Sequence, residues 1–192
     1  MTTVLIAGRR APHQDFEGDD WTPGAGGRWV TCTDSSLGRM VAYATNGRVN
    51  RDGRVYRSAI HPHDPDGITL PQAAQACMTV TGLPFVIPPH WQWPELLAHL
   101  RARKGAVVQG WYSGIPREYR FQARADFGHA LFISHYSTTA GMRVWDALDA
   151  NTKHHGQWIP ARYVRAFMEE LSRRNGTTAL YVGYVPLQPL TI

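Results

Sequence analysis

The chain is 192 residues long; 43% of its residues are hydrophobic, 18% are charged, and the formal net charge is +5. This length suits one domain with a substantial core, and the composition excludes a disordered chain and a fibrous repeat. Lysine and arginine are spread from Arg9 to Arg174 without a dense basic block, so we expect no specific nucleic-acid partner.

The number of cysteines and the length of the apolar segments indicate in which cellular compartment the protein is made. The chain has two cysteines, Cys32 and Cys77, which is too few for a scaffold held by disulfides. The apolar residues 4–8 are followed by Arg9 and Arg10, which is the wrong order for a signal peptide. No stretch of the sequence approaches the roughly 20 apolar residues of a membrane span. We therefore expect cytoplasmic synthesis without a signal peptide, and no membrane partner.

The first half of the chain has the pattern of helices. Apolar residues at positions 37, 40, 41 and 44 recur at helical spacing, Thr33 or Asp34 can cap the helix start, and Asn46 with Gly47 can end it. Prolines open two later helices, and Gly105 is expected to end the second of these. The helices are expected over residues 35–44, 70–78 and 95–103, with turn-rich sequence over 48–69 and a short strand over 83–87.

The second half has the pattern of strands. Two apolar, β-prone segments join as a hairpin across a short polar turn at 137–141. An amphipathic helix is expected near the end of the chain. The strands are predicted over residues 106–111, 128–136, 142–145, 157–159 and 179–185, and the helix over 161–173. Helices followed by an antiparallel sheet is the order of an α+β fold.

We expect residues 1–192 to form a single domain. The first 27 residues are rich in Gly, Pro and Asp and are predicted to be a flexible N-terminal arm, with at most a short strand over 3–7. Residues 186–192 are predicted to be a C-terminal tail.

Three residues have the types and places that a thiol nucleophile requires. Cys32 precedes a predicted helix, whose start favours a thiolate. His129 begins one strand of the hairpin and Asp146 ends the other, so the two can be neighbours. Asp149 and Asn151 are rivals for the third position, although both are more typical of a turn. A cysteine at a helix start is, in most proteins, only a small buried residue.

The segments around these residues resemble a known family. Residues 32–47 (CTDSSLGRMVAYATNG) are similar to the cysteine helix of the papain-like peptidases that process bacteriocins by cleaving after a double glycine. Residues 128–136 (GHALFISHY) resemble their histidine strand, and residues 143–146 (RVWD) resemble the strand that ends on their third catalytic residue. The resemblance covers roughly residues 28–160 and implies a papain-like fold.

The resemblance implies amide hydrolysis through a thioester. Cys32 would be the nucleophile, His129 the general base and acid, and Asp146 the group that orients the histidine. Two positions depart from the family's pattern. Thr33 stands where the family has glycine, and Gly26 stands where it has a glutamine that donates to the oxyanion. Loss of such a donor costs about 10²–10³ in rate.

Three functions therefore remain open. The first is a cysteine peptidase or amidase acting on a peptide or on peptidoglycan. The second is a structural component of a phage tail or capsid, with a weak or relic site and other virion proteins as partners. The third is an acyl transferase that uses the same three residues.

Other chemistry-bearing residues are interpreted as structural. Cys77 lies in a predicted helix among alanines and is expected in the core. His61 and His63 lie in a proline-rich loop without zinc-ligand spacing, so we expect no metal and no cofactor. The aromatic residues Trp91, Trp93, Trp111 and Tyr112 are expected to be core and rim.

Overall fold

The computed structural model describes residues 32–60, 68–120, 126–147 and 156–189. Its helices are α2 (Cys32–Ala44), α3 (Gly53–Ser58), α4 (Leu70–Thr81), α5 (Trp93–Arg101) and α6 (Ala161–Arg174), with two 3-10 turns, η1 (Tyr112–Gly114) and η2 (Arg117–Tyr119). Its strands are β1 (Ala106–Trp111), β2 (Gly128–Ser137), β3 (Gly141–Asp146), β4 (Gln157–Ile159) and β5 (Val182–Gly183). The predicted α+β order is confirmed.

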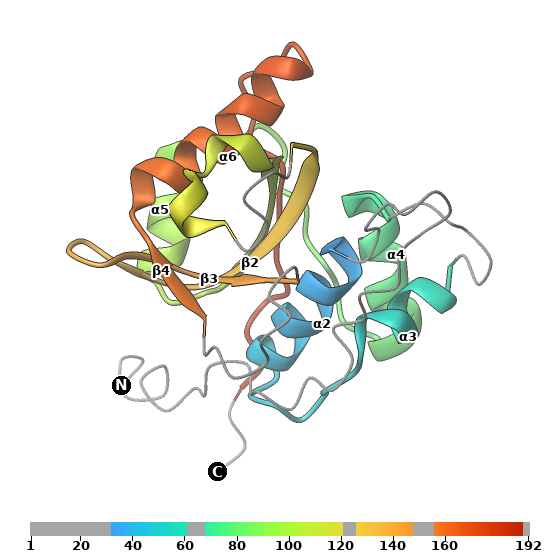
Figure 1. Ribbon diagram of the computed structural model, residues 1–192. Coiled ribbons are helices and arrows are strands. Elements are labelled where there is room, and N and C mark those ends of the chain that lie inside the picture. The colour runs from blue at the N-terminus through green and yellow to red at the C-terminus, as the bar shows by residue number, and fades with distance from the viewer. Residues whose placement is uncertain (1–31, 61–67, 121–125, 148–155, 190–192) are drawn as a thin grey trace.

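An antiparallel sheet separates two groups of helices (Figure 1). The five strands lie in the order β4-β3-β2-β1-β5. Helices α5 and α6 pack on one face, where Leu96, Leu100 and Phe167 meet the inward side chains of the sheet. Helices α2 and α4 pack on the other face, against Val107 and Phe132. Because side chains alternate along a strand, β1, β2 and β3 supply both cores.

Helix α2 is buried on every side. Each residue from Thr33 to Ala44 is buried, including the polar residues near its start. The sheet covers one side, while α3 and α4 cover the others, as Figure 1 shows on its right-hand side. None of the described helices is both long and apolar enough to cross a membrane.

Several predicted elements differ from the structure. The segment predicted as turns contains α3, because the Asp52 side chain accepts from the Arg54 N–H at 2.8 Å and Tyr56 is buried against α2. Residues 83–87 form only the single bridge between Val86 and Tyr184, because three prolines around it remove N–H donors.

The bounds of four elements also differ from the prediction. Helix α2 begins at Cys32 and not at residue 35, so Thr33 and Asp34 lie inside it and do not cap its start. Helix α4 continues to Thr81, beyond the predicted end at residue 78. Helix α5 ends at Arg101, and the left-handed residue that follows is Arg103 (φ 55°), where Gly105 was expected to end the helix. Strand β5 is limited to Val182 and Gly183. The predicted strand at 3–7, the N-terminal arm, the loop at 61–67, Asp149 and Asn151 lie outside the described residues.

The described part of the predicted C-terminal tail is bonded to the end of α2. The Gln188 N–H donates to the Ala44 carbonyl at 2.9 Å. The Arg48 guanidinium donates to the Pro189 carbonyl at 3.0 Å. Residues 186–189 therefore close the C-terminal end of the cysteine-bearing helix.

The hairpin turn yields a stability prediction. Gly141 has φ 96°, and a Cβ there would collide with the Ile159 carbonyl oxygen and lie 2.8 Å from the Pro160 Cα. Gly141→Ala should therefore lower the free energy of unfolding by about 2–4 kcal/mol, measured in urea. Gly176 has φ 66° with nothing within 4 Å of a Cβ, so Gly176→Ala should cost only about 1–2 kcal/mol. Equal losses in the two variants would contradict this account.

Candidate active site

The three residues singled out in the sequence lie where the start of α2 meets the sheet. Cys32 is the first residue of α2 and is half-buried. His129 is the second residue of β2, and Asp146 is the last residue of β3. Asp146 pairs with Leu131 in the β2–β3 register, two positions along β2 from His129. The hairpin therefore brings the imidazole and the carboxylate to the same side of the sheet.

His129 and Asp146 form a buried hydrogen bond. His129 Nε2 lies 2.6 Å from Asp146 Oδ1, and the two side chains are only 1% and 3% exposed. The imidazole also meets the rings of Tyr112 and Phe127 edge-on, with centroids 4.9 and 5.8 Å away. The carboxylate and the two aromatic rings fix the orientation of the imidazole.

Cys32 also acts on His129. Burial alone would lower the pKa of His129, but the Asp146 carboxylate with its hydrogen bond, together with the Cys32 thiol, raises it to about 10. Since Nε2 is bonded to Asp146, Nδ1 is the ring nitrogen left to exchange a proton with the sulfur.

Tyr112 completes the environment of Asp146. This tyrosine is fully buried, and its hydroxyl donates to Asp146 Oδ2 at 2.8 Å. Both carboxylate oxygens are therefore hydrogen-bonded, one by His129 and the other by Tyr112. The sequence predicted Tyr112 only as core or rim, because residues 34 positions apart give no local signal of contact.

Thr33, which departs from the family's glycine, has a structural partner. Its buried hydroxyl accepts a hydrogen bond from the Gln109 side chain of β1 at 3.2 Å. This bond ties the first turn of α2 to the sheet one residue away from Cys32. Gly26 lies outside the described residues.

Asp34 is a buried carboxyl group in the same turn. Its Oδ1 accepts from the Ser35 N–H at 3.1 Å, while Oδ2 has no hydrogen-bond partner. Gly53 of α3 covers this turn so closely that a Cβ there would lie 2.7 Å from the Ser35 nitrogen. Burial raises the pKa of Asp34 to about 7, although the Arg57 charge lowers it. This carboxyl is therefore largely neutral below pH 7, beside the candidate nucleophile.

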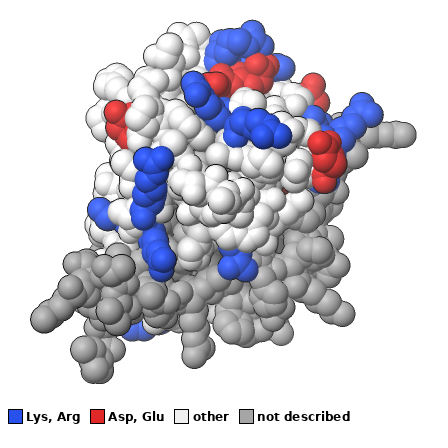
Figure 2. All heavy atoms as spheres, turned by 90° about the vertical axis from the view of Figure 1, so that its left-hand side faces the viewer, with Lys and Arg blue, Asp and Glu red and all other residues white. Residues whose placement is uncertain are grey.

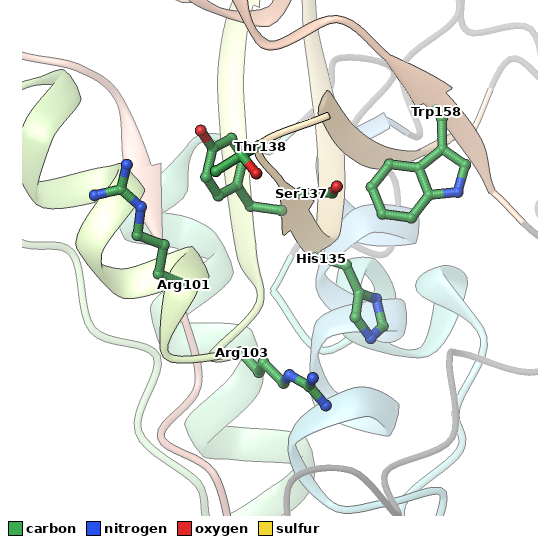
Figure 3. Close-up of a pocket in the computed structure, with 7 residues that line it drawn as sticks. Arg101, Arg103, His135, Ser137, Thr138 and Trp158 are labelled. Carbon is green, nitrogen blue, oxygen red and sulfur yellow. The ribbon is translucent and has the colours of Figure 1, made fainter. Parts of the chain in front are cut away.

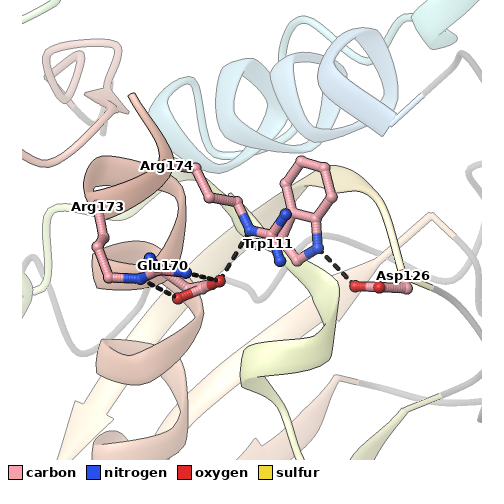
Figure 4. A network of polar contacts seen from close by, with 5 residues as sticks. All are labelled: Trp111, Asp126, Glu170, Arg173 and Arg174. Carbon is pink, nitrogen blue, oxygen red and sulfur yellow. Dashed lines mark hydrogen bonds and ion pairs between the residues drawn. The ribbon is translucent and has the colours of Figure 1, made fainter. Parts of the chain in front are cut away.

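A polar network lies beside the start of β2 (Figure 4). The Trp111 indole donates to Asp126 at 2.5 Å, and the Arg174 guanidinium stacks 4.0 Å from the centre of the indole. Arg174 also donates to Glu170 at 2.8 Å. Trp111 pairs with Gly128, the neighbour of His129. The network thus fixes an aromatic side chain at the edge of the candidate site.

Cys77 is not part of the candidate active site. Cys77 is buried in α4, as predicted, and burial raises the pKa of its thiol. Within the described ranges, no group of three or more His, Cys, Asp or Glu residues is arranged to hold a metal ion. His61 and His63 lie outside those ranges.

The comparisons with known proteins concern the fold. No family model matches the chain, and no curated protein matches it. Among solved structures, the chain is similar to a Bacillus anthracis protein that is provisionally named a C39-like peptidase. The TM-score is 0.56, with 13% identity, over 83% of this chain and 90% of that one. The chain therefore shares the fold of that protein. This likeness supports the predicted papain-like fold.

Tyr112 yields a prediction with a matched control. Tyr112→Phe leaves Asp146 Oδ2 without its buried donor and should lower the free energy of unfolding by about 1–3 kcal/mol. The Tyr56 hydroxyl is buried without a hydrogen-bond partner, so Tyr56→Phe should leave the stability unchanged or raise it. Urea unfolding of both variants tests the difference. If the Tyr112→Phe protein is as stable as the wild type, the Tyr112 hydroxyl does not stabilise the Asp146 carboxylate.

Asp34 yields a prediction about pH. Its folded pKa is raised to about 7 from 3.8, so the stability it contributes is present below pH ~3.8 and is lost as pH rises through 7. Asp34→Asn keeps the shape and removes the titration. It should match the wild type near pH 4 and exceed its free energy of unfolding by about 2–4 kcal/mol at pH 8.

Urea unfolding at several pH values measures this gain. Asp126 is exposed and its pKa is lowered, chiefly by the Trp111 hydrogen bond, so Asp126→Asn serves as the control and should show no such gain at pH 8. A difference between Asp34→Asn and the wild type that stays constant from pH 4 to pH 8 would contradict the assignment.

Proposed function

We propose that this protein is a cysteine peptidase or amidase that hydrolyses an amide bond with Cys32, His129 and Asp146. The observation that carries the proposal is the environment of His129. Its imidazole is enclosed in the protein with a carboxylate on one nitrogen, and the Cys32 thiol helps to raise its pKa. A nucleophile, a base and a group that orients the base are the three parts of thiol hydrolysis.

The first half-reaction forms a thioester. The thiol proton passes to His129, and the sulfur attacks the carbonyl carbon of the substrate. The raised pKa of His129 favours the imidazolium, which Asp146 stabilises. When the carbon–nitrogen bond breaks, the imidazolium gives its proton to the departing amine. The acyl group then remains on Cys32.

The second half-reaction restores the enzyme. Neutral His129 takes a proton from water, whose oxygen attacks the thioester, and the thiolate of Cys32 leaves. The negative charge on the carbonyl oxygen needs hydrogen-bond donors in both halves. The N–H groups in the first turn of a helix lack intrahelical acceptors, so those at the start of α2 can donate to this oxygen.

A peptide or peptidoglycan amide is the substrate class that we propose. The likeness to a C39-like peptidase supports peptide-bond chemistry through the fold. The virion role predicted from the sequence gains no support from the comparisons, and it stays a prediction. The acyl-transferase alternative shares the first half-reaction and differs in the acceptor of the acyl group.

The function is tested by a single substitution. Cys32→Ala should reduce turnover of a peptide library or of peptidoglycan by at least about 10³-fold, because the thioester cannot form. It should change the stability by only about 1–2 kcal/mol. Turnover that persists in the variant would show that Cys32 is not the nucleophile.

Thiol labelling gives a readout that does not require the substrate. Iodoacetamide near pH 6 should label Cys32, beside the His129 imidazolium, and spare the buried Cys77. Asp146→Asn should slow the labelling of Cys32, because the imidazolium loses its partner. Equal labelling of both cysteines with the same pH profile would make Cys32 a packing residue.

A further inference from the structure

A cavity of about 560 Å³ lies at the end of β2 that is farther from His129 (Figure 3). Its walls come from three parts of the chain: the end of α5, the end of β2 with its turn, and β4. The lining includes Arg101, Arg103, His135, Thr138 and Trp158. Since His129 and the turn occupy opposite ends of β2, roughly 25 Å separates the cavity from the candidate active site.

The charge of the cavity is positive. Two arginines line it, and no carboxylate is among its lining residues. In the described parts of the chain, no carboxylate forms an ion pair with Arg101 or Arg103. Figure 2 looks onto the side toward which the β2–β3 hairpin projects, and its lower half shows basic but no acidic described side chains. A pocket with this charge favours an anion.

The arginines are presented by a fixed turn. Arg103 has a left-handed backbone, and its carbonyl accepts from the buried Tyr43 hydroxyl at 2.8 Å. The Arg103 N–H donates to the Leu100 carbonyl at 2.9 Å. The Arg101 guanidinium lies over the Tyr136 ring at 5.5 Å. Because this turn is held by buried contacts, the two guanidinium groups lose less freedom when a ligand binds.

A bulge in β2 shapes the floor of the cavity. Ile133 pairs with Val144 and His135 pairs with Arg143, so Ser134 is an extra residue in the strand. Bulges of this kind redirect a side chain. Arg143 in turn pairs with Trp158 on β4. His135, Arg143 and Trp158 thus form one row across three strands, on the same face of the sheet.

Ser134 orients the His135 ring. The Trp145 indole donates to Ser134 Oγ at 2.9 Å. His135 Nδ1 also lies 2.9 Å from Ser134 Oγ, which leaves Nε2 as the ring nitrogen for a ligand. Burial and the charges of Arg143 and Arg103 lower the pKa of His135, so the imidazole is neutral at pH 7.

We propose that this cavity binds a small phosphate-bearing ligand with a ring or other flat apolar part. A phosphate has more acceptor oxygens than a carboxylate, which suits a lining that holds two guanidinium groups, the Thr138 hydroxyl and the His135 imidazole. Trp158, which is 40% exposed, supplies a flat wall on the side opposite Arg101 in Figure 3. This binding is independent of the proposed peptidase chemistry.

The test uses phenyl phosphate, inorganic phosphate and benzoate as probes of the full-length protein. Calorimetry should show phenyl phosphate binding at millimolar or lower concentration, inorganic phosphate about tenfold more weakly, and benzoate most weakly. In NMR titrations of the wild type, phenyl phosphate should shift the Trp158 indole and the amides of residues 101–103 and 135–138. No binding at millimolar concentration, or shifts centred on His129, would overturn the proposal.

Substitutions separate the two parts of the site. Arg101→Gln combined with Arg103→Gln should weaken phenyl phosphate by at least about tenfold. Arg54→Gln is the matched control, because α3 lies on the opposite side of the molecule (Figure 1), and it should leave binding unchanged. Trp158→Leu should remove the advantage of phenyl phosphate over inorganic phosphate. Benzoate binding as tight as phenyl phosphate, or a double variant that binds like the control, would overturn the assignment.

Discussion

The hydrogen bond between His129 and Asp146 is the interaction on which the rest of the site depends. Two ionisable groups that are 1% and 3% exposed remain inside a protein only when each is paired, because an uncompensated buried charge costs several kcal/mol. The pairing requires the β2–β3 register, which the turn at Gly141 holds. It also requires Tyr112 on the second oxygen of Asp146. The hairpin and the buried tyrosine are therefore conditions for the proposed chemistry as well as for the fold.

The elements with a strong local pattern were predictable from sequence. Strand β1 has the predicted bounds, and the β2–β3 hairpin and α6 lie within one or two residues of theirs. Helix α3 was not predicted, because it has only six residues, begins with glycine and depends on the burial of Tyr56 against α2. The left-handed backbone conformation of Arg103 was not predicted, because glycine is the usual residue in that conformation. These elements are decided by packing, which a local pattern does not encode.

In the candidate site, too, the residues that lie in clear sequence patterns were predictable, whereas the contacts that surround them were not. Cys32, His129 and Asp146 were predicted because each stands at the end of an element with a clear sequence pattern, and because the segments resemble a family. Two supporting contacts join residues that are 34 and 76 positions apart, Tyr112 with Asp146 and Gln109 with Thr33. The raised pKa of Asp34 likewise follows from α3 covering the first turn of α2. Such effects follow from the completed fold, so the sequence alone predicts the candidate reacting groups better than their environment.

The burial of α2 between the sheet and two helices places the thiol and the imidazole in different layers. Their separation is therefore a property of the core between them, where Met40 and Val41 meet Val107 and Phe132. Protein cores are packed as densely as organic crystals, so a change of side-chain volume there moves whole elements. A displacement of about 1 Å can change a rate by 10²-fold. For the proposed hydrolysis, the rate is therefore expected to depend on apolar residues of this core that never touch a substrate.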